Sequence, residues 1–329
     1  MAAPNTTMWE AAPHTLAKHA ILRRYLQAWF PILAKHHGRL VYLDGFAGPG
    51  RYSQGEEGSP IIALNTALQH FAPFRDSQLA FVFVERKRDR SSWLRDVEIP
   101  KLGLPSHFET HIFEGEFEQI LGGFLDKLDA QGLKIAPTFA FVDPFGITGL
   151  PFTLVERLLQ RPHCEAFITF MSSSIHRFVT QLPDQVNTLL GDPHAAAKIS
   201  ASDTPGLEAR RLYAESLRRV AKFVRFFEMR DMNGVPIYDL FLCHKPPTGP
   251  PEDEGSHVGR RRHGYVHVLR RSGPKPVDHV RNRCGRDPRS TSLRALSRRR
   301  SRRVGGDPPV RTRQDGLPGN TRKEGPRAA

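Results

Sequence analysis

Short apolar runs alternate along the chain with longer stretches in which apolar residues recur every three or four positions. Five runs have the length of buried strands: 40–43, 79–84, 107–113, 138–142 and 166–170. Helical spacing predicts helices at 14–37, 61–71, 88–97, 117–128 and 151–160, the first of them bent or interrupted at Pro31. This alternation predicts an α/β, Rossmann-like doubly wound sheet that is mostly parallel and has helices on both faces.

The pattern after the fifth strand predicts two more helices and a late strand. One helix covers 174–190 and is interrupted at Pro183. The next covers 207–229, with a buried stripe formed by Leu212, Leu217, Val220, Val224 and Phe227. The run 237–243 predicts a strand that closes the edge of the sheet.

Four successive predicted strands end in an acidic residue: Asp44, Glu85, Glu114 and Asp143. Doubly wound sheets bind ligands outside the carboxyl ends of their strands, so these acids are expected to line one site of hydrogen-bond acceptors. The alternative is that each acid caps the helix that follows its strand.

A glycine-rich turn follows the first strand, with Asp44 at its start and then Gly45, Phe46, Gly48 and Gly50. Its spacing differs from the dinucleotide-binding Gly-x-Gly-x-x-Gly, and no Gly-Lys-Ser/Thr follows, so neither phosphate-binding loop is supported. A tight turn with a carboxylate at its mouth suits a cationic ligand such as S-adenosylmethionine, which carries a sulfonium and an ammonium. An ordinary strand-to-helix turn is the alternative.

Charge divides the chain at Lys245. The formal charge is +14, and residues 245–329 carry 22 Lys and Arg against 8 Asp and Glu, whereas residues 1–244 carry 26 of each. We therefore expect a flexible N-terminus at 1–13, a Rossmann-like domain at 14–244, and a disordered basic tail at 245–329.

The remaining composition predicts a protein of a reducing compartment. Cys164, Cys243 and Cys284 are too far apart in the sequence for a metal-binding cluster or a disulfide framework, so no metal site is expected. The chain has no apolar run of membrane-spanning length and no signal-peptide pattern at its N-terminus. We expect a soluble, cytoplasmic protein.

The tail from 245 onward has no usable apolar period, and two interpretations remain open. The first is a frameshift near Pro246 and Pro247, which would place everything beyond it out of frame. It is supported because shifting the reading frame by one base permits an amphipathic translation across 249–268. The alternative is a basic arm that binds phosphates without sequence preference.

The acids and the glycine turn resemble the layout of class I S-adenosylmethionine-dependent methyltransferases. This resemblance implies that Asp44 to Gly50 wrap the methionine part of the cofactor, that Glu85 binds the ribose hydroxyls and that Glu114 and Gly115 lie beside the adenine. The resemblance also implies a substrate-facing tip formed by Asp143, Pro144, Phe145 and Gly146. This tip is similar to the Asp-Pro-Pro-Tyr tips used on exocyclic amines, but it departs from them at Phe145 and Gly146.

A closer resemblance covers about residues 14–245. Segments at 18–19, 42–50, 58–60, 141–146, 170–171 and 175–178 are similar to those of the three-Cys-motif partner protein (TcmP) family. These bacterial, methyltransferase-like proteins usually accompany a radical-S-adenosylmethionine-like protein, which is the partner implied here. Lys18 and His19, in the first of these segments, are either a solvated helix end or face the ligand.

Three functions follow as hypotheses. The first is methyl transfer from S-adenosylmethionine to an amine that is held by Asp143 and the Pro144 backbone, with Phe145 stacked on a planar group. The second is a catalytically inactive module that binds the cofactor or the partner. The third is nucleic-acid binding through the tail, which the electroneutral body disfavours; a nucleic-acid substrate stays an open option.

Overall fold

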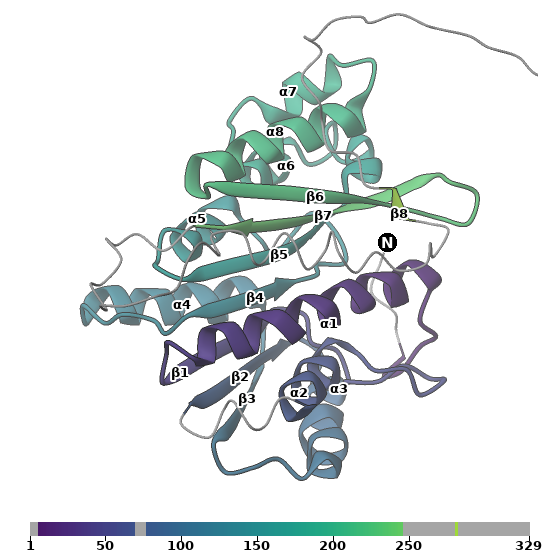
Figure 1. The fold of residues 1–329 in the computed structure, drawn as a ribbon. Helices are drawn as coiled ribbons and strands as arrows, with labels where there is room; N and C mark the ends of the chain where they lie inside the picture. The colour runs from purple at the N-terminus through teal and green to yellow at the C-terminus, as the bar shows by residue number, and fades with distance from the viewer. Residues whose placement is uncertain (1–5, 70–76, 246–279, 282–329) are drawn as a thin grey trace, which may run out of the picture. The chain divides into compact units, whose positions relative to one another are not determined.

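The predicted strands lie side by side in one sheet (Figure 1). The computed structural model describes residues 6–69, 77–245 and 280–281. The strand order is β3-β2-β1-β4-β5-β7-β6-β8. The strands are β1 (Arg39–Asp44), β2 (Gln78–Glu85), β3 (Phe108–Glu114), β4 (Thr138–Val142), β5 (Cys164–Phe170), β6 (Phe223–Arg230), β7 (Pro236–His244) and β8 (Val280–Arg281).

Strands β1 to β5 are parallel to one another, whereas β6, β7 and β8 pair antiparallel. Strand β1 pairs with β2 on one side and β4 on the other, β2 pairs with β3, and β4 pairs with β5. Strand β7 runs antiparallel to β5 and β6, and β6 also pairs with β8. The prediction of a Rossmann-like, doubly wound and mostly parallel sheet is confirmed. The carboxyl ends of β1, β2 and β4 consequently meet at one edge.

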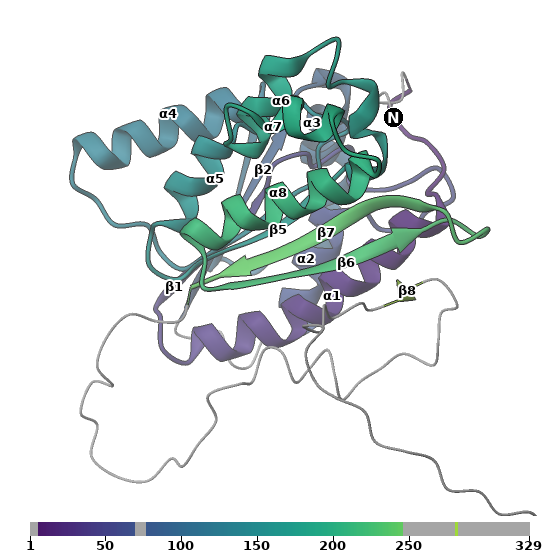
Figure 2. The ribbon, with the colours of Figure 1, turned by 90° about the horizontal axis from the view of Figure 1, so that it is seen from above.

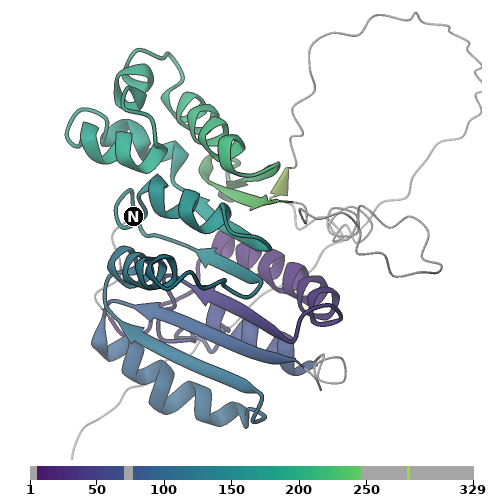
Figure 3. The same ribbon diagram turned by 90° about the vertical axis from the view of Figure 1, so that its left-hand side faces the viewer.

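Helices cover both faces of the sheet (Figures 2 and 3). One face packs on α1 (Pro13–Ala34), α2 (Ser59–Gln69) and the turns after α3 (Arg88–Trp93), which are a π-helix (Leu94–Glu98) and a 3-10 helix (Ile99–Leu102). The other face packs on α4 (Phe117–Ala130), α5 (Phe152–Leu159), α6 (Pro183–Leu190), α7 (Ala195–Ser200) and α8 (Pro205–Val220). Helix α1 packs against β1 and α2, and it continues through Pro31 instead of ending there.

The predicted helix at 207–229 is wrong in its second half. Helix α8 ends at Val220, Ala221 is extended, and Phe223–Arg230 is strand β6. This segment is rich in aromatic and β-branched residues, which favour a pleated surface once a neighbouring strand is available. Val224 and Phe227 therefore belong to the sheet, and β7 lies between β5 and β6 instead of closing the sheet edge.

The predicted helix at 174–190 is two separate elements. A 3-10 helix covers Ser172–Arg177, and α6 begins at Pro183. Proline is favoured in the first turn of a helix, where its missing N–H has no intrahelical partner. Pro183 therefore starts a helix instead of interrupting one.

The predicted tail lies outside the described residues from 246 onward, apart from the two-residue strand β8, so the frameshift hypothesis concerns residues that the structure does not describe. Within the described part of the chain, no helix is long and apolar enough to cross a membrane.

Aromatic rings fill the core between α1 and the sheet. Phe139 of β4 is fully buried, and its ring centroid lies 5.1 Å from that of Tyr25, 5.8 Å from that of Trp29 and 6.2 Å from that of Tyr42. Packing of this kind holds α1 against the strands that end at the site.

Truncation of Phe139 tests this packing. We expect Phe139→Ala to lower the free energy of unfolding by about 3–5 kcal/mol, because it leaves a cavity among three other rings. Urea unfolding would measure the change. Phe124→Ala is the control, since that side chain is 47% exposed on α4, and it should cost less than about 0.5 kcal/mol. Equal losses in the two variants would contradict the assigned core.

Candidate functional site

Two neighbouring cavities open at the carboxyl edge of the sheet. The first, here the Asp143 cavity, has a volume of about 250 Å³ and is lined from α1, the glycine turn, the end of β4 and β7. The second, the Glu85 cavity, has a volume of about 590 Å³ and is lined from the turn and the ends of β2, β3 and β4. Phe46 and Phe145 line both cavities, so the two spaces meet at these rings.

The glycine turn brings bare backbone to both cavities. Gly48 and Gly50 have φ of 65° and 90°, a region that residues with a side chain rarely adopt. A Cβ on Gly50 would lie 2.8 Å from Cδ1 of Leu94, and one on Gly45 would lie 2.9 Å from the ring of Phe117. The turn therefore requires glycine for its conformation and for its close packing.

Asp44 lies behind the turn, not at its mouth. Its side chain is fully buried and lines neither cavity. The Phe46 backbone N–H donates to Oδ1 at 3.2 Å, and the Tyr42 hydroxyl donates to Oδ2 at 3.4 Å. Burial raises the pKa of Asp44 to about 7, against the opposing effect of hydrogen bonds from Ser59 and Phe46. Asp44 is thus placed to hold the turn in shape.

Glu85 lines its cavity and also ties β2 to the glycine turn. The backbone N–H of Gly48 donates to Oε2 at 2.9 Å, and that of Lys87 donates to Oε1 at 2.8 Å. Each carboxylate oxygen has a second lone pair, so Glu85 can accept further hydrogen bonds from a ligand. Its position at the rim matches the prediction from the sequence.

Glu114 differs from the other three acids. Its side chain is exposed and lines neither cavity, whereas the adjacent Gly115 lines the Glu85 cavity together with Glu116 and Phe117. Strand β3 is the edge strand of the sheet, and its last residue is more open to solvent than those of the strands inside. The structure thus brings Asp143 and Glu85 to the two cavities, with Asp44 behind them and Glu114 outside.

The tip after β4 divides between the two cavities. Asp143 and Pro144 line the first, Gly146 lines the second and Phe145 lines both. The Asp143 carboxylate is paired with the ammonium of Lys18, from α1. Burial favours the protonated form of Asp143, but the Lys18 charge outweighs this effect and holds the pKa of the carboxyl below its ordinary value.

Aromatic rings surround this ion pair. The Trp9 centroid lies 5.5 Å from that of Tyr52 and 6.3 Å from that of Phe145, and His19 lies 5.7 Å from Tyr52. On the opposite side, His14 lies 5.6 Å from Tyr238. Such rings provide flat apolar walls for a planar ligand.

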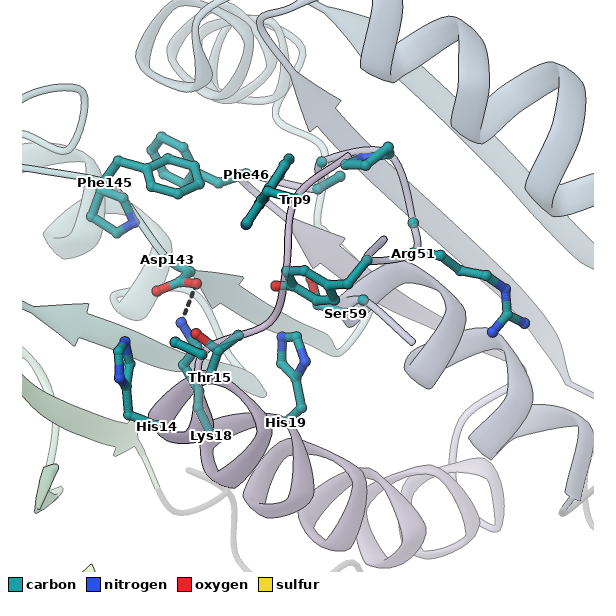
Figure 4. Close-up of a pocket in the computed structure, with 18 of the residues that line it drawn as sticks. Trp9, His14, Thr15, Lys18, His19, Phe46, Arg51, Ser59, Asp143 and Phe145 are labelled. Atoms are coloured by element: carbon teal, nitrogen blue, oxygen red, sulfur yellow. Dashed lines mark hydrogen bonds and ion pairs between the residues drawn. The ribbon is translucent and has the colours of Figure 1, made fainter. Parts of the chain in front are cut away.

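Two imidazoles flank Lys18 on α1, as Figure 4 shows. Burial, together with the Lys18 charge, lowers the pKa of His19 to about 3 and also lowers that of His14. Both rings are neutral at pH 7 and add no charge to the cavity. The side chains of Lys18 and His19 are buried on the cavity wall, so they are not a solvated helix end.

The segment before α1 forms part of the site. Arg90 donates from Nη2 to the Thr6 carbonyl at 2.9 Å, and its guanidinium lies 4.4 Å from the Trp9 ring centroid. The Ser53 N–H donates to the Trp9 carbonyl at 2.9 Å. Residues 6–9, predicted as part of a flexible terminus, are therefore tied to α3 and to the loop after β1.

The sequence pattern did not indicate three of these lining residues: Trp9, His14 and Tyr238. Trp9 could have been found from the sequence, because it is a lone large aromatic residue in a polar segment. Tyr238 is nearly a hundred residues from Asp143 in the chain, and only the pairing of β7 with β5 brings it near. Among the described residues, no group of His, Cys, Asp and Glu has the arrangement of a metal site.

No protein-family model and no curated protein matches the sequence. Solved structures with a similar arrangement include a Listeria monocytogenes protein assigned as a class I S-adenosylmethionine-dependent methyltransferase. It has 8% identity and a TM-score of 0.40, and the match covers 77% of this chain and 66% of that one.

Two further similar structures have TM-scores of 0.35. One is the Synechocystis magnesium protoporphyrin IX methyltransferase, with 10% identity over 70% of this chain and 85% of that one. The other is a methyltransferase of Agrobacterium tumefaciens, with 11% identity over 72% and 63%. This chain thus spans slightly less than two thirds of the Listeria and Agrobacterium proteins.

The buried carboxyl of Asp44 leads to a pH-dependent prediction. A folded-state pKa raised to about 7 means that folding favours protonated Asp44, so its contribution to stability is lost as pH rises from about 4 to 7. Between pH 5 and pH 8, wild type should lose about 2–3 kcal/mol of unfolding free energy relative to Asp44→Asn. Urea unfolding at both pH values measures this difference, and parallel pH profiles would exclude a raised pKa.

Proposed function

We propose that the chain binds S-adenosylmethionine across the two cavities and transfers its methyl group to an amine. The observation that carries the proposal is the junction of the cavities at Phe46 and Phe145, between the Glu85 carboxylate and the Asp143 carboxylate. An elongated ligand with one polar hydroxylated end and one reactive end fits this arrangement.

The Glu85 cavity fits the adenosine end. Glu85 has free lone pairs for ribose hydroxyls, and Phe117 and Phe46 supply apolar surface beside Gly115. A Cβ on Gly45 or Gly50 would collide with a neighbouring side chain, so the glycine turn is tightly packed at this edge of the sheet. The Gly48 and Gly50 backbone then lies beside the methionine end in the Asp143 cavity.

The Asp143 cavity fits the acceptor. When bound, S-adenosylmethionine supplies an electrophilic methyl group on a positively charged sulfur. Asp143 and the Pro144 carbonyl can accept the N–H bonds of an amine and thereby direct the nitrogen lone pair, while Phe145 and Trp9 provide flat contacts for the group that carries it. The protein's contribution is orientation and exclusion of water.

The family likeness also carries a proposal about a partner, a radical-S-adenosylmethionine-like three-Cys-motif protein. One observation favours the alternative of an inactive binding module. Asp143 is already paired with Lys18, which leaves less of its carboxylate for an acceptor. Cofactor binding without turnover would identify that case.

Cofactor titration tests the assignment of the acids. Calorimetry with S-adenosylmethionine should show that Glu85→Ala weakens binding by about 10- to 100-fold, because ribose hydroxyls lose a charged acceptor. Asp143→Ala should retain binding but lose transfer of a labelled methyl group to RNA, DNA or protein pools. Glu114→Ala is the matched control: it removes an exposed acid from the next strand and should bind like wild type. A loss with Glu114→Ala equal to that with Glu85→Ala would refute the placement.

Trp9 provides an independent optical test. Because its ring contacts both Tyr52 and Phe145 at the cavity, we expect S-adenosylmethionine to change the tryptophan emission of wild type. Trp9→Phe should remove that change. Trp93→Phe is the control, since Trp93 donates to Glu98 outside both cavities and should leave the change intact.

A further inference from the structure

Lys18 is an unusual lysine because its charged end is inside the protein. The residue is 4% exposed, although lysine ordinarily keeps its ammonium in water. It extends from α1 to the Asp143 carboxylate, and its Nζ lies 5.4 Å from the centroid of the Tyr238 ring. An ammonium withdrawn from water in this way requires a counter-charge, and Asp143 supplies it.

The other groups around Asp143 do not provide a second cation. Those that face it are His14, Lys18 and His19 of α1, Tyr42 and Asp44 of β1, Tyr52 of the following loop, Thr169 of β5 and Tyr238 of β7. The imidazoles are neutral, and burial raises the pKa of all three tyrosines. Arg51 lines the cavity, but its Nε is paired with Glu98 at 3.0 Å. Among the described residues, Lys18 is therefore the cation that balances Asp143.

Without Lys18, Asp143 would face only neutral groups and the second acid, Asp44. A carboxyl in such surroundings takes up a proton, and a protonated carboxyl offers an acceptor amine a donor where it needs an acceptor. The ion pair also limits the rotation of the Asp143 side chain, because Lys18 holds one of its oxygens.

We infer that Lys18 is a positioning residue that fixes the Asp143 carboxylate toward the cavity as an anion, leaving its other oxygen for the acceptor amine. The inference rests on the proposed function for the identity of the acceptor, but the pairing itself does not. The opposite role, in which Lys18 blocks Asp143, predicts that removing the lysine raises turnover.

The first test measures the carboxyl directly by ¹³C NMR of protein labelled at its aspartate carboxyls, with the Asp143 signal assigned by its loss in Asp143→Asn. The signal should not titrate between pH 5 and pH 9 in wild type or in Lys18→Arg, which keeps the charge. In Lys18→Met the midpoint should rise by about one to three pH units. An unchanged midpoint would overturn the inference. Lys18→Gln is the second variant, to be used if Lys18→Met does not fold.

The second test is the pH dependence of methyl transfer, using labelled S-adenosylmethionine and the acceptor pool that wild type modifies. Turnover by Lys18→Met should fall by up to about tenfold at pH 5, as the protonated fraction of Asp143 rises, and recover toward pH 9, whereas Lys18→Arg should keep the wild-type profile. An equal loss at every pH, or a gain, would refute the positioning role. Wild type that binds no S-adenosylmethionine would refute the proposed function, while the NMR titration would still decide the pairing.

Discussion

The close approach of the chain to itself after β1 is the constraint on which the site depends. Gly58 donates its N–H to the Gly50 carbonyl at 2.8 Å, and a Cβ on Gly58 would lie 2.9 Å from that same oxygen. Gly50 in turn packs on Leu94, and Gly45 packs on Phe117. The backbone of the glycine turn therefore forms part of the lining of the cavities at the carboxyl edge of the sheet.

The buried carboxylates of the site each have a partner that offsets their charge. Asp143 is balanced by Lys18, and both Glu85 oxygens accept backbone N–H groups. Asp44 is buried and hydrogen-bonded with its pKa raised to about 7. The acids are therefore not a single negative patch that attracts any cation. Asp44 accepts a hydrogen bond from the turn, whereas Glu85 and Asp143 line separate cavities.

Local sequence pattern predicted the parallel half of the sheet well because those strands are short, apolar runs bounded by turns. It failed at 223–230, where the apolar spacing fits a helical stripe as well as a strand buried on one face. Pairing with β7 decided between the two. Pro183 was misjudged for a related reason: proline ends one helix as readily as it begins another, and the neighbouring residues do not distinguish these cases.

The sequence by itself determined the Rossmann-like alternation, the glycine turn and the acids at the strand ends, because these depend on residues that are close in the chain. Only the tertiary structure decided which acids line the cavities. Asp44 and Glu114 end predicted strands just as Glu85 does, yet one is buried behind the turn and the other is exposed on the edge strand. Only the fold placed Lys18 and Tyr238 beside Asp143, because contacts between distant segments depend on how the strands pair and where α1 packs.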